Sequence, residues 1–176
     1  MLLGIISDSH DNVSFVVKAI NVLINNNIDE IIHLGDIISP FIPRFIKREF
    51  ETKNVDIKLT SILGNNDGDV YSLNKVFNEY KWRLLSNPCI VEYENRSFYL
   101  MHGYSSTDFT EKLARAVLEK LDVDGVFYGH THRLLIDRIG DRILLNPGEV
   151  CGYLTGRSTV VILDTRDLST RVIELT

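Results

Sequence analysis

The sequence has few cysteines, no long apolar run and no dense cluster of basic residues. No stretch reaches the roughly 18 apolar residues that a membrane-spanning helix needs. The N-terminus lacks the basic segment and apolar run of a secretory signal, so we expect a cytoplasmic protein. Cys89 and Cys151 are too few and too far apart for a disulfide framework or a paired-cysteine metal site, and we expect ordinary reduced residues. A net charge of -5 without basic runs argues against nucleic acid as the default partner.

The length and the even composition predict one folding unit, residues 1–176. A chain of 176 residues with 44% hydrophobic content fits a single compact core. No internal repeat, low-complexity segment or linker rich in proline, glycine and serine divides it. We therefore expect a single domain, and whether it forms a homo-oligomer stays open.

The first half of the chain alternates between strand and helix patterns. Short apolar runs predict strands, and apolar residues at helical spacing predict helices. Ser39 and Pro40 resemble a helix start, with Ser39 as the N-cap and Pro40 at the first helical position. The predicted strands cover 2–7, 30–37 and 57–67, and the predicted helices cover 13–26 and the segment from 40 onward. Strands that alternate with helices pair in parallel, with the helices on the faces of the sheet.

The second half predicts mainly hairpins around one helix. Glu94 and Asn95 form a short connection between two apolar runs, which is typical of a hairpin. Thr107 is a candidate N-cap for a helix over 107–121. Further strands are predicted within 89–93, 96–103, 124–132, 134–148, 157–164 and 170–175. We therefore expect two sheets packed face to face, with helices outside.

Polar side chains gather where the apolar runs end, most visibly in the segment GHTH at 129–132. In open α/β sheets, ligands bind at the carboxyl ends of the strands. Seven side chains occupy such positions: Asp8, His10, Asp36, Asn65, His102, His130 and His132. Four imidazoles and three oxygen donors are more than a single metal ion usually takes, and they are enough for two ions that share a bridging carboxylate. The fifth histidine, His33, lies inside an apolar strand and is interpreted as structural or supporting rather than as a ligand.

Five short motifs resemble, in order and spacing, the signature of the calcineurin-like metallophosphoesterases. They are Asp8-x-His10, Gly35-Asp36, Gly64-Asn65, His102-Gly103 and Gly129-His130-x-His132. The short chain is similar to the small phosphodiesterase branch of that superfamily. The resemblance implies a four-layer α-β-β-α sandwich of two mixed sheets flanked by helices, with two divalent metal ions. It implies one ion on Asp8, His10, Asp36 and His132, and the other on Asp36, Asn65, His102 and His130.

The resemblance also implies a reaction, in which a metal-bridging hydroxide attacks a small phosphodiester. Mn²⁺ is the favoured ion, with Ni²⁺, Fe²⁺, Zn²⁺ and Co²⁺ as alternatives. No serine or cysteine nucleophile is required, and no glycine-rich phosphate loop is present. The alternative function is a non-catalytic, protein-binding scaffold of the same fold, similar to the retromer subunit of this superfamily. Because all seven ligand positions carry competent side chains, the enzyme is favoured over the scaffold.

The segment GNND at 64–67 departs from the pattern of that family. Asn65, Asn66 and Asp67 are the candidate catalytic residues here. Asn66 stands where many of these enzymes have a histidine that protonates the leaving oxygen, and an amide cannot transfer a proton at useful pH. Asp67 is expected either to orient an imidazole or to cap a turn. The group that protonates the leaving oxygen and the physiological substrate stay open.

Overall fold

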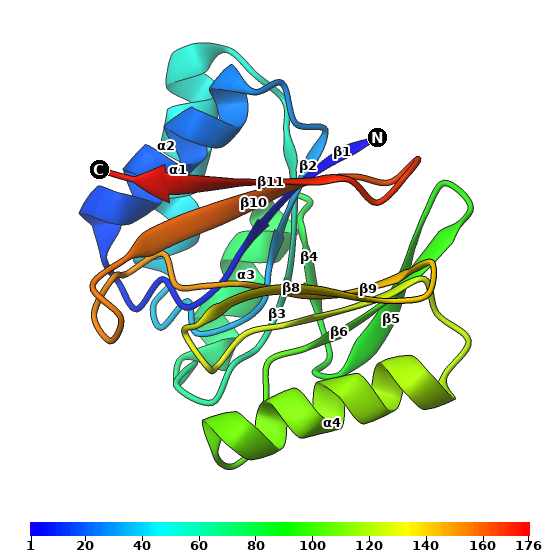
Figure 1. Cartoon of the computed structure of the whole chain (residues 1–176). Coiled ribbons are helices and arrows are strands. Elements are labelled where there is room, and N and C mark those ends of the chain that lie inside the picture. Colours follow the sequence, from blue (N-terminus) through cyan, green and yellow to red (C-terminus); the bar gives the residue numbers. More distant parts are fainter.

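The computed structural model describes residues 1–176 as two mixed β-sheets packed face to face, with helices on both outer faces (Figure 1). The helices are α1 (Val13–Asn25), α2 (Phe41–Lys53), α3 (Val70–Glu79) and α4 (Thr107–Lys120). The strands are β1 (Leu2–Ile6), β2 (Glu30–His33), β3 (Lys58–Ile62), β4 (Arg83–Leu85), β5 (Cys89–Tyr93), β6 (Arg96–Met101), β7 (Gly125–Tyr128), β8 (Leu134–Ile139), β9 (Arg142–Pro147), β10 (Ser158–Asp164) and β11 (Thr170–Leu175). None of the helices combines the length and the hydropathy that crossing a membrane requires.

The order of the strands confirms the predicted sandwich. The first sheet has the order β11-β10-β1-β2-β3-β4, and the second has the order β5-β6-β7-β9-β8. Strands β1 to β4 pair in parallel, as do β6, β7 and β9. Antiparallel strands β10 and β11 complete one edge of the first sheet, and antiparallel β5 and β8 complete the two edges of the second. The parallel strands in the centre of each sheet therefore bring several carboxyl ends to one end of the molecule.

Three apolar layers hold the sandwich together. The first lies between the first sheet and helices α1, α2 and α3, and includes Ile20 and Phe50. The second lies between the two sheets, where Phe98 and Phe127 stack with ring centroids 4.7 Å apart. The third joins α4 to the second sheet through residues such as Leu118. Because the parallel strands are buried on both faces of their sheets, their sequences are nearly continuous apolar runs.

Several predicted boundaries differ from the structure. Helix α2 begins at Phe41 and has no side-chain cap, because the Ser39 hydroxyl donates instead to Asp11 at 2.7 Å. The prediction of Ser39 as an N-cap is therefore wrong. The prediction of Thr107 as an N-cap is also wrong, because Ser106 accepts from the backbone N–H of Phe109 at 3.2 Å. Strands β2 and β3 stop four and five residues before the predicted ends at 37 and 67, respectively, so the polar residues after them lie in loops.

The sequence patterns did not predict α3 or β4. Asp69 caps α3 by accepting from the backbone N–H of Ser72 at 3.1 Å. Buried Leu73, Val76 and Phe77 form the inner face of this helix. It begins three residues after Asp67, so it closes the loop that carries the segment GNND.

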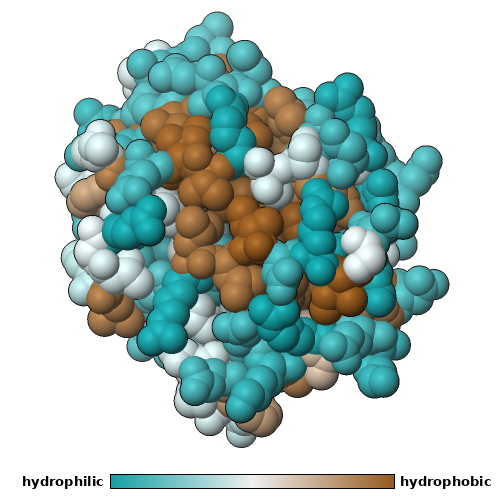
Figure 2. Space-filling model, in the orientation of Figure 1, coloured by the Kyte–Doolittle hydropathy of each residue, from teal (hydrophilic) through white to brown (hydrophobic).

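The face of the molecule that carries β11 is not uniformly polar. Figure 2 shows apolar residues gathered toward the middle of this face, with hydrophilic residues around them. Val172 of the edge strand β11 contributes exposed apolar surface, with 39% of its area accessible. Edge strands with apolar side chains are surfaces on which chains associate.

Candidate metal centre

The loops after β1, β2, β3, β6 and β7 meet at one end of the sandwich (Figure 1). Direct contacts join the loops of the two sheets there. The backbone N–H of His130 donates to Oδ2 of Asp8 at 3.1 Å. The backbone N–H of Val150 donates to the carbonyl of Ser7 at 2.9 Å. Each predicted ligand lies on one of these converging loops.

The backbone is strained at most of these positions. Asp8, His10, Asp36, His130 and His132 have positive φ, with values between 42° and 66°. Residues other than glycine seldom adopt this region, and each such residue costs on the order of 1–3 kcal/mol. The surrounding structure must enforce these conformations, so the fold holds the five side chains in fixed directions.

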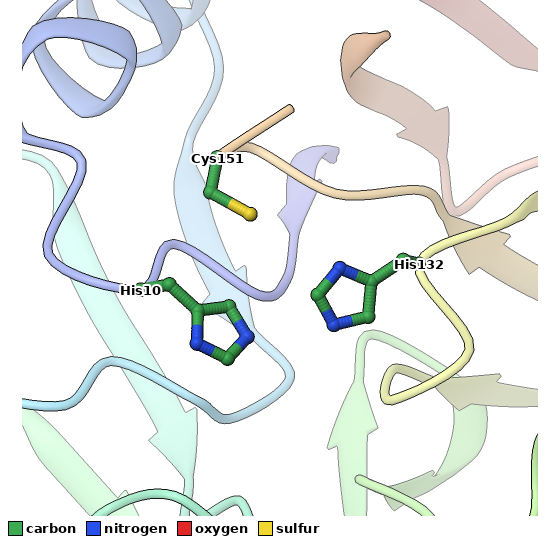
Figure 3. Close-up of side chains that lie close together, drawn as sticks. All are labelled: His10, His132 and Cys151. Carbon is green, nitrogen blue, oxygen red and sulfur yellow. The ribbon is translucent and has the colours of Figure 1, made fainter. Parts of the chain in front are cut away.

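The first cluster contains Asp8, His10, His132 and Asp36. Nε2 of His132 lies 3.4 Å from Oδ1 of Asp8, and Nε2 of His10 lies 3.3 Å from Oδ2 of Asp36. The imidazoles of His10 and His132 stack with centroids 5.1 Å apart, and Figure 3 shows them facing each other across a small space. Carboxylate oxygens and imidazole nitrogens together form a donor set that divalent transition metals bind.

The second cluster contains Asn65, His102 and His130, beside Asp36. Nε2 of His102 and Nδ1 of His130 lie 3.0 Å and 2.8 Å from Oδ1 of Asn65. Nε2 of His102 also lies 3.4 Å from Oδ2 of Asp36, the oxygen that faces His10 in the first cluster. The structure therefore brings all seven predicted ligands together, in two groups that share Asp36.

In three of the imidazoles, the ring nitrogen that points away from the clusters, here called the outer nitrogen, has a hydrogen-bond acceptor as its partner. Nδ1 of His102 and Nε2 of His130 donate to backbone carbonyls at 2.7 Å and 2.9 Å. Nδ1 of His132 donates to the Glu149 carboxylate at 2.7 Å. Because these oxygens only accept, the outer nitrogens hold the protons. In a ring that carries a single proton, the opposite nitrogen is then available to bind a metal ion in the interior of the site.

Buried polar atoms without partners show that these residues fit metal ions. Oγ of Ser7, Oδ1 of Asp8 and Nε2 of His10 are buried without a hydrogen bond. Burial raises the pKa of Asp8, because an ionised carboxylate away from water needs a counter-charge. In the second cluster, Nε2 of His102 and Nδ1 of His130 converge on the side-chain oxygen of Asn65, so three donor atoms surround one point. Divalent cations would supply charge and coordination to both clusters.

Asn66 and Asp67 stabilise Asp36 and the surrounding loop. Asn66 donates to the Asp36 carboxylate from its backbone N and from Nδ2, each at 2.8 Å. Asp67 accepts from the backbone N–H groups of Gly64, Ile38 and Asp36 at 2.6, 2.7 and 3.1 Å. Of the two roles predicted for Asp67, the structure shows turn capping, and no imidazole contacts its carboxylate. The Asn66 amide likewise donates to Asp36, which assigns it a supporting contact.

His33 is buried outside both clusters. Its Nδ1 accepts from the backbone N–H of Gly35 at 3.2 Å, and its Nε2 lies 3.0 Å from the hydroxyl of Ser9. Burial and the charge of nearby His102 lower the pKa of His33 to about 3, so the ring is neutral. Because both ring nitrogens have protein partners, the contacts agree with the interpretation of His33 as structural.

Glu149 is a fully buried carboxylate that the motifs did not place in the site. It accepts from His132, from the Cys151 thiol at 3.0 Å, and from the backbone and side chain of Thr155 at 2.6 and 2.7 Å. Burial raises the pKa of Glu149, but these hydrogen bonds outweigh it and lower the pKa to about 2. Glu149 follows β9, which pairs in parallel with β7, so its place at a strand end was the signal that would have identified it. It orients His132 and anchors the following loop.

Cys151 also lies beside the first cluster (Figure 3). Ligand atoms of His10, His132 and Cys151 all lie within 4.8 Å of one another, and the sulfur points toward the space between the rings. Burial and the neighbouring Glu149 raise the pKa of Cys151 to about 12, so it remains a protonated thiol. Both cysteines are unpaired, as predicted. Cys151 nevertheless packs against the site and is not an ordinary core residue.

Glu149→Gln is expected to weaken Mn²⁺ binding by roughly 10- to 100-fold, the usual effect of losing a partner that orients a ligand. An amide presents one acceptor atom in place of two and can turn its own N–H group toward His132. Calorimetric titration of metal-free protein measures the affinity. Glu119→Gln, an exposed change on α4, is the control. An unchanged affinity in folded Glu149→Gln protein would show that Glu149 does not position His132.

The fold and the site define a metallophosphoesterase. Residues 1–168 match the calcineurin-like phosphoesterase superfamily domain, and the chain belongs to this superfamily. It is therefore a hydrolase that acts on phosphoric esters and depends on divalent metal ions.

Two archaeal relatives match almost the whole chain. A phosphodiesterase of Methanocaldococcus jannaschii is 36% identical over 176 residues, which cover 99% of both chains. A probable metallophosphoesterase of Methanothermobacter thermautotrophicus is 31% identical over 179 residues, which cover 98% of this chain and 92% of the relative.

Solved structures share the architecture. An archaeal phosphodiesterase superposes with a TM-score of 0.85 at 33% identity and covers 99% of this chain and 100% of its own. Vps29 of Chaetomium thermophilum superposes with a TM-score of 0.73 at 18% identity, over 100% of this chain and 86% of its own. At that identity, Vps29 shares the fold alone.

Proposed function

We propose that the chain hydrolyses small phosphodiesters with two divalent metal ions held by the seven clustered side chains. The position of Asp36 supports this most directly, because its Oδ2 lies 3.3 Å from Nε2 of His10 and 3.4 Å from Nε2 of His102. We assign Asp8, His10, Asp36 and His132 to one ion, and Asp36, Asn65, His102 and His130 to the other. Mn²⁺ is the favoured ion, with Ni²⁺, Fe²⁺, Zn²⁺ and Co²⁺ as alternatives.

Divalent ions at such a site supply Lewis acidity, which activates water and neutralises phosphoryl oxygens. The side chains of this protein keep the site in place: Asn66 holds Asp36, and Glu149 holds His132. Cys151 does not act as a nucleophile, because its thiol is protonated and donates to Glu149. Asn66 supplies no proton to the leaving oxygen, since its amide donates to Asp36.

The enzyme is favoured over the scaffold. The relative that is 36% identical over nearly the full length is named a phosphodiesterase. All seven ligand positions carry side chains that can bind a metal, whereas a scaffold would not need to keep buried, strained and unpaired polar groups. The likeness to Vps29 concerns the fold and adds nothing in favour of a scaffold.

Hydrolysis of bis(p-nitrophenyl) phosphate tests the proposed function. Metal-depleted protein is expected to be inactive, and added Mn²⁺ is expected to produce nitrophenolate. A parallel assay with p-nitrophenyl phosphate measures preference for the diester over the monoester. Failure to hydrolyse either ester with any of the five metals would reject the enzyme in favour of the scaffold.

Three further expectations accompany the proposed function. We propose that residues 1–176 act as a single domain, supported by the continuous apolar layers between the sheets and helices. A cytoplasmic location is supported by the two unpaired cysteines, Cys89 and Cys151. A homo-oligomer is supported by the apolar surface near β11.

Asn66→Ala is expected to lower kcat/KM by roughly 10- to 100-fold, equally for nitrophenyl and alkyl phosphodiesters. Burial would raise the pKa of Asp36, but His102 and the two donors of Asn66 keep it well below its ordinary value. Loss of the amide therefore disturbs Asp36 whatever group leaves. Asn74→Ala, an exposed change on α3, is the control. A much larger loss for the alkyl ester would instead place Asn66 at the leaving oxygen.

A further inference from the structure

A pocket of about 260 Å³ opens beside His132, at the edge of the candidate metal centre. It is lined by His132, Arg133, Leu134, Thr155, Arg157 and Thr159, of which only Leu134 is hydrophobic. Guanidinium groups match the geometry of phosphate and carboxylate oxygens and donate charge-assisted hydrogen bonds to them. Two arginines in one small pocket of a protein with a net charge of -5 therefore favour an anionic ligand.

Arg133 is available to such a ligand. It directly follows His132, and its guanidinium forms no hydrogen bond or ion pair within the chain, since only its backbone N–H is bonded. On its other side, Arg133 borders a second hollow that also includes Asp108 and Glu111 of α4. Neither carboxylate pairs with it, because Glu111 bonds Arg115 at 3.0 Å and Asp108 has no ion-pair partner. The charge of Arg133 is therefore not neutralised by a direct contact.

Arg157 is held in position across the pocket. Its Nη2 and Nε donate to the Glu174 carboxylate at 2.8 and 3.2 Å, which leaves Nη1 without a partner. The threonine hydroxyls beside it already donate, from Thr155 to Glu149 at 2.7 Å and from Thr159 to a backbone carbonyl at 2.6 Å. These hydroxyls offer only lone pairs to a ligand. Donation to an anion in this pocket therefore comes from the two guanidinium groups.

Hydrogen bonds connect this pocket to the candidate metal centre. Thr155 donates to Glu149, and Glu149 accepts from His132 at 2.7 Å. His132 in turn lies 3.4 Å from Asp8 in the first cluster. Because His132 belongs both to the first cluster and to the lining of the pocket, the pocket borders the candidate metal centre.

We propose that this pocket binds a second phosphate group, carried on one ester substituent of the phosphodiester substrate. The proposal rests on the proposed phosphodiesterase function and narrows its substrate class to phosphodiesters with an additional phosphate. Arg133 and Arg157 bind the additional phosphate, and the clustered ligands hold the scissile one.

Two matched substrates test the proposal with Mn²⁺-loaded protein. One is the p-nitrophenyl ester of thymidine 5′-phosphate, and the other is the same ester with a 3′-phosphate. The measured quantity is the ratio of their kcat/KM values. Wild-type protein is expected to favour the 3′-phosphorylated ester by roughly 10-fold or more, the usual effect of hydrogen bonds to a charged group. Arg133→Gln is expected to lower this ratio toward one, and the double change with Arg157→Gln is expected to remove the preference.

Arg48→Gln is the matched control, because Arg48 is an exposed arginine on α2, away from the pocket. It is expected to keep the wild-type ratio. Calorimetric titration with thymidine 3′,5′-bisphosphate and with thymidine 5′-phosphate gives an independent binding readout, in which the bisphosphate should bind more tightly to wild type and to Arg48→Gln protein but not to the double variant. Equal kcat/KM values for both esters in wild type, or a preference that survives the double change, would overturn the subsite and leave the phosphodiesterase intact. Failure to hydrolyse both thymidine esters and bis(p-nitrophenyl) phosphate would overturn the subsite and the phosphodiesterase together.

Discussion

Asp36→Asn is expected to lower turnover by more than roughly 100-fold, beyond the loss that follows from changing a supporting residue. The Asp36 carboxylate lies between the two clusters, with Oδ2 3.3 Å from Nε2 of His10 and 3.4 Å from Nε2 of His102. In the proposed two-ion site, the amide removes the negative charge of the carboxylate assigned to both ions, so one substitution weakens both. Initial rates with bis(p-nitrophenyl) phosphate at limiting Mn²⁺ measure the effect.

The Asp36 experiment needs a folded variant and a neutral control. Circular dichroism establishes that Asp36→Asn protein keeps its secondary structure. Asp56→Asn, an exposed change before β3, removes one carboxylate elsewhere and is expected to keep wild-type turnover. Near-native turnover of folded Asp36→Asn protein at limiting metal would mean that Asp36 does not bridge.

Mn²⁺ is expected to raise the melting temperature of the wild-type protein by more than about 10 °C. Binding to the folded state alone stabilises it by about 4 kcal/mol per site at a free concentration 1,000 times Kd, and each kcal/mol shifts the melting temperature of a chain of this size by about 2–4 °C. The gain should be large because Asp8 is fully buried and its Oδ1 lacks a partner. Thermal scans with EDTA and with Mn²⁺ measure the shift.

Asp8→Asn separates metal binding from other effects of Mn²⁺. Burial raises the pKa of Asp8, so the carboxylate destabilises the metal-free protein. The neutral amide should therefore raise the melting temperature in EDTA and reduce the response to Mn²⁺. Asp56→Asn should respond as wild type does. A response of Asp8→Asn protein as large as that of wild type would argue that Asp8 does not bind the ion.

Strand ends could be predicted from the sequence because two simple rules act together. Apolar runs such as the one before Asp8 identify buried parallel strands, and parallel strands deliver the residues after them to one edge. That reasoning placed His102 and His130 on loops that the structure brings together. The same rule covers Glu149, which follows β9, but none of the five motifs contains it.

Contacts between side chains could not be predicted in the same way. The hydrogen-bond partner of the Asn66 amide depends on the path of the loop after β3. That loop is held in place by backbone N–H groups that donate to the Asp67 carboxylate. The predicted N-cap of α2 was wrong for a similar reason, since the Ser39 hydroxyl donates a hydrogen bond to Asp11 rather than capping its own helix. A short amphipathic helix such as α3 lacks a strong pattern of its own, and its buried face is defined by the residues it packs against.

Metal content measured by elemental analysis is the most direct test of the central claim that seven side chains hold two ions shared by Asp36. Wild-type protein is reconstituted with Mn²⁺, separated from free metal, and measured beside Asp36→Asn and Asp56→Asn proteins. We expect about two ions per chain in wild type and in Asp56→Asn, and fewer in Asp36→Asn. The absence of bound metal in reconstituted wild type, together with hydrolysis that resists chelation, would contradict the account.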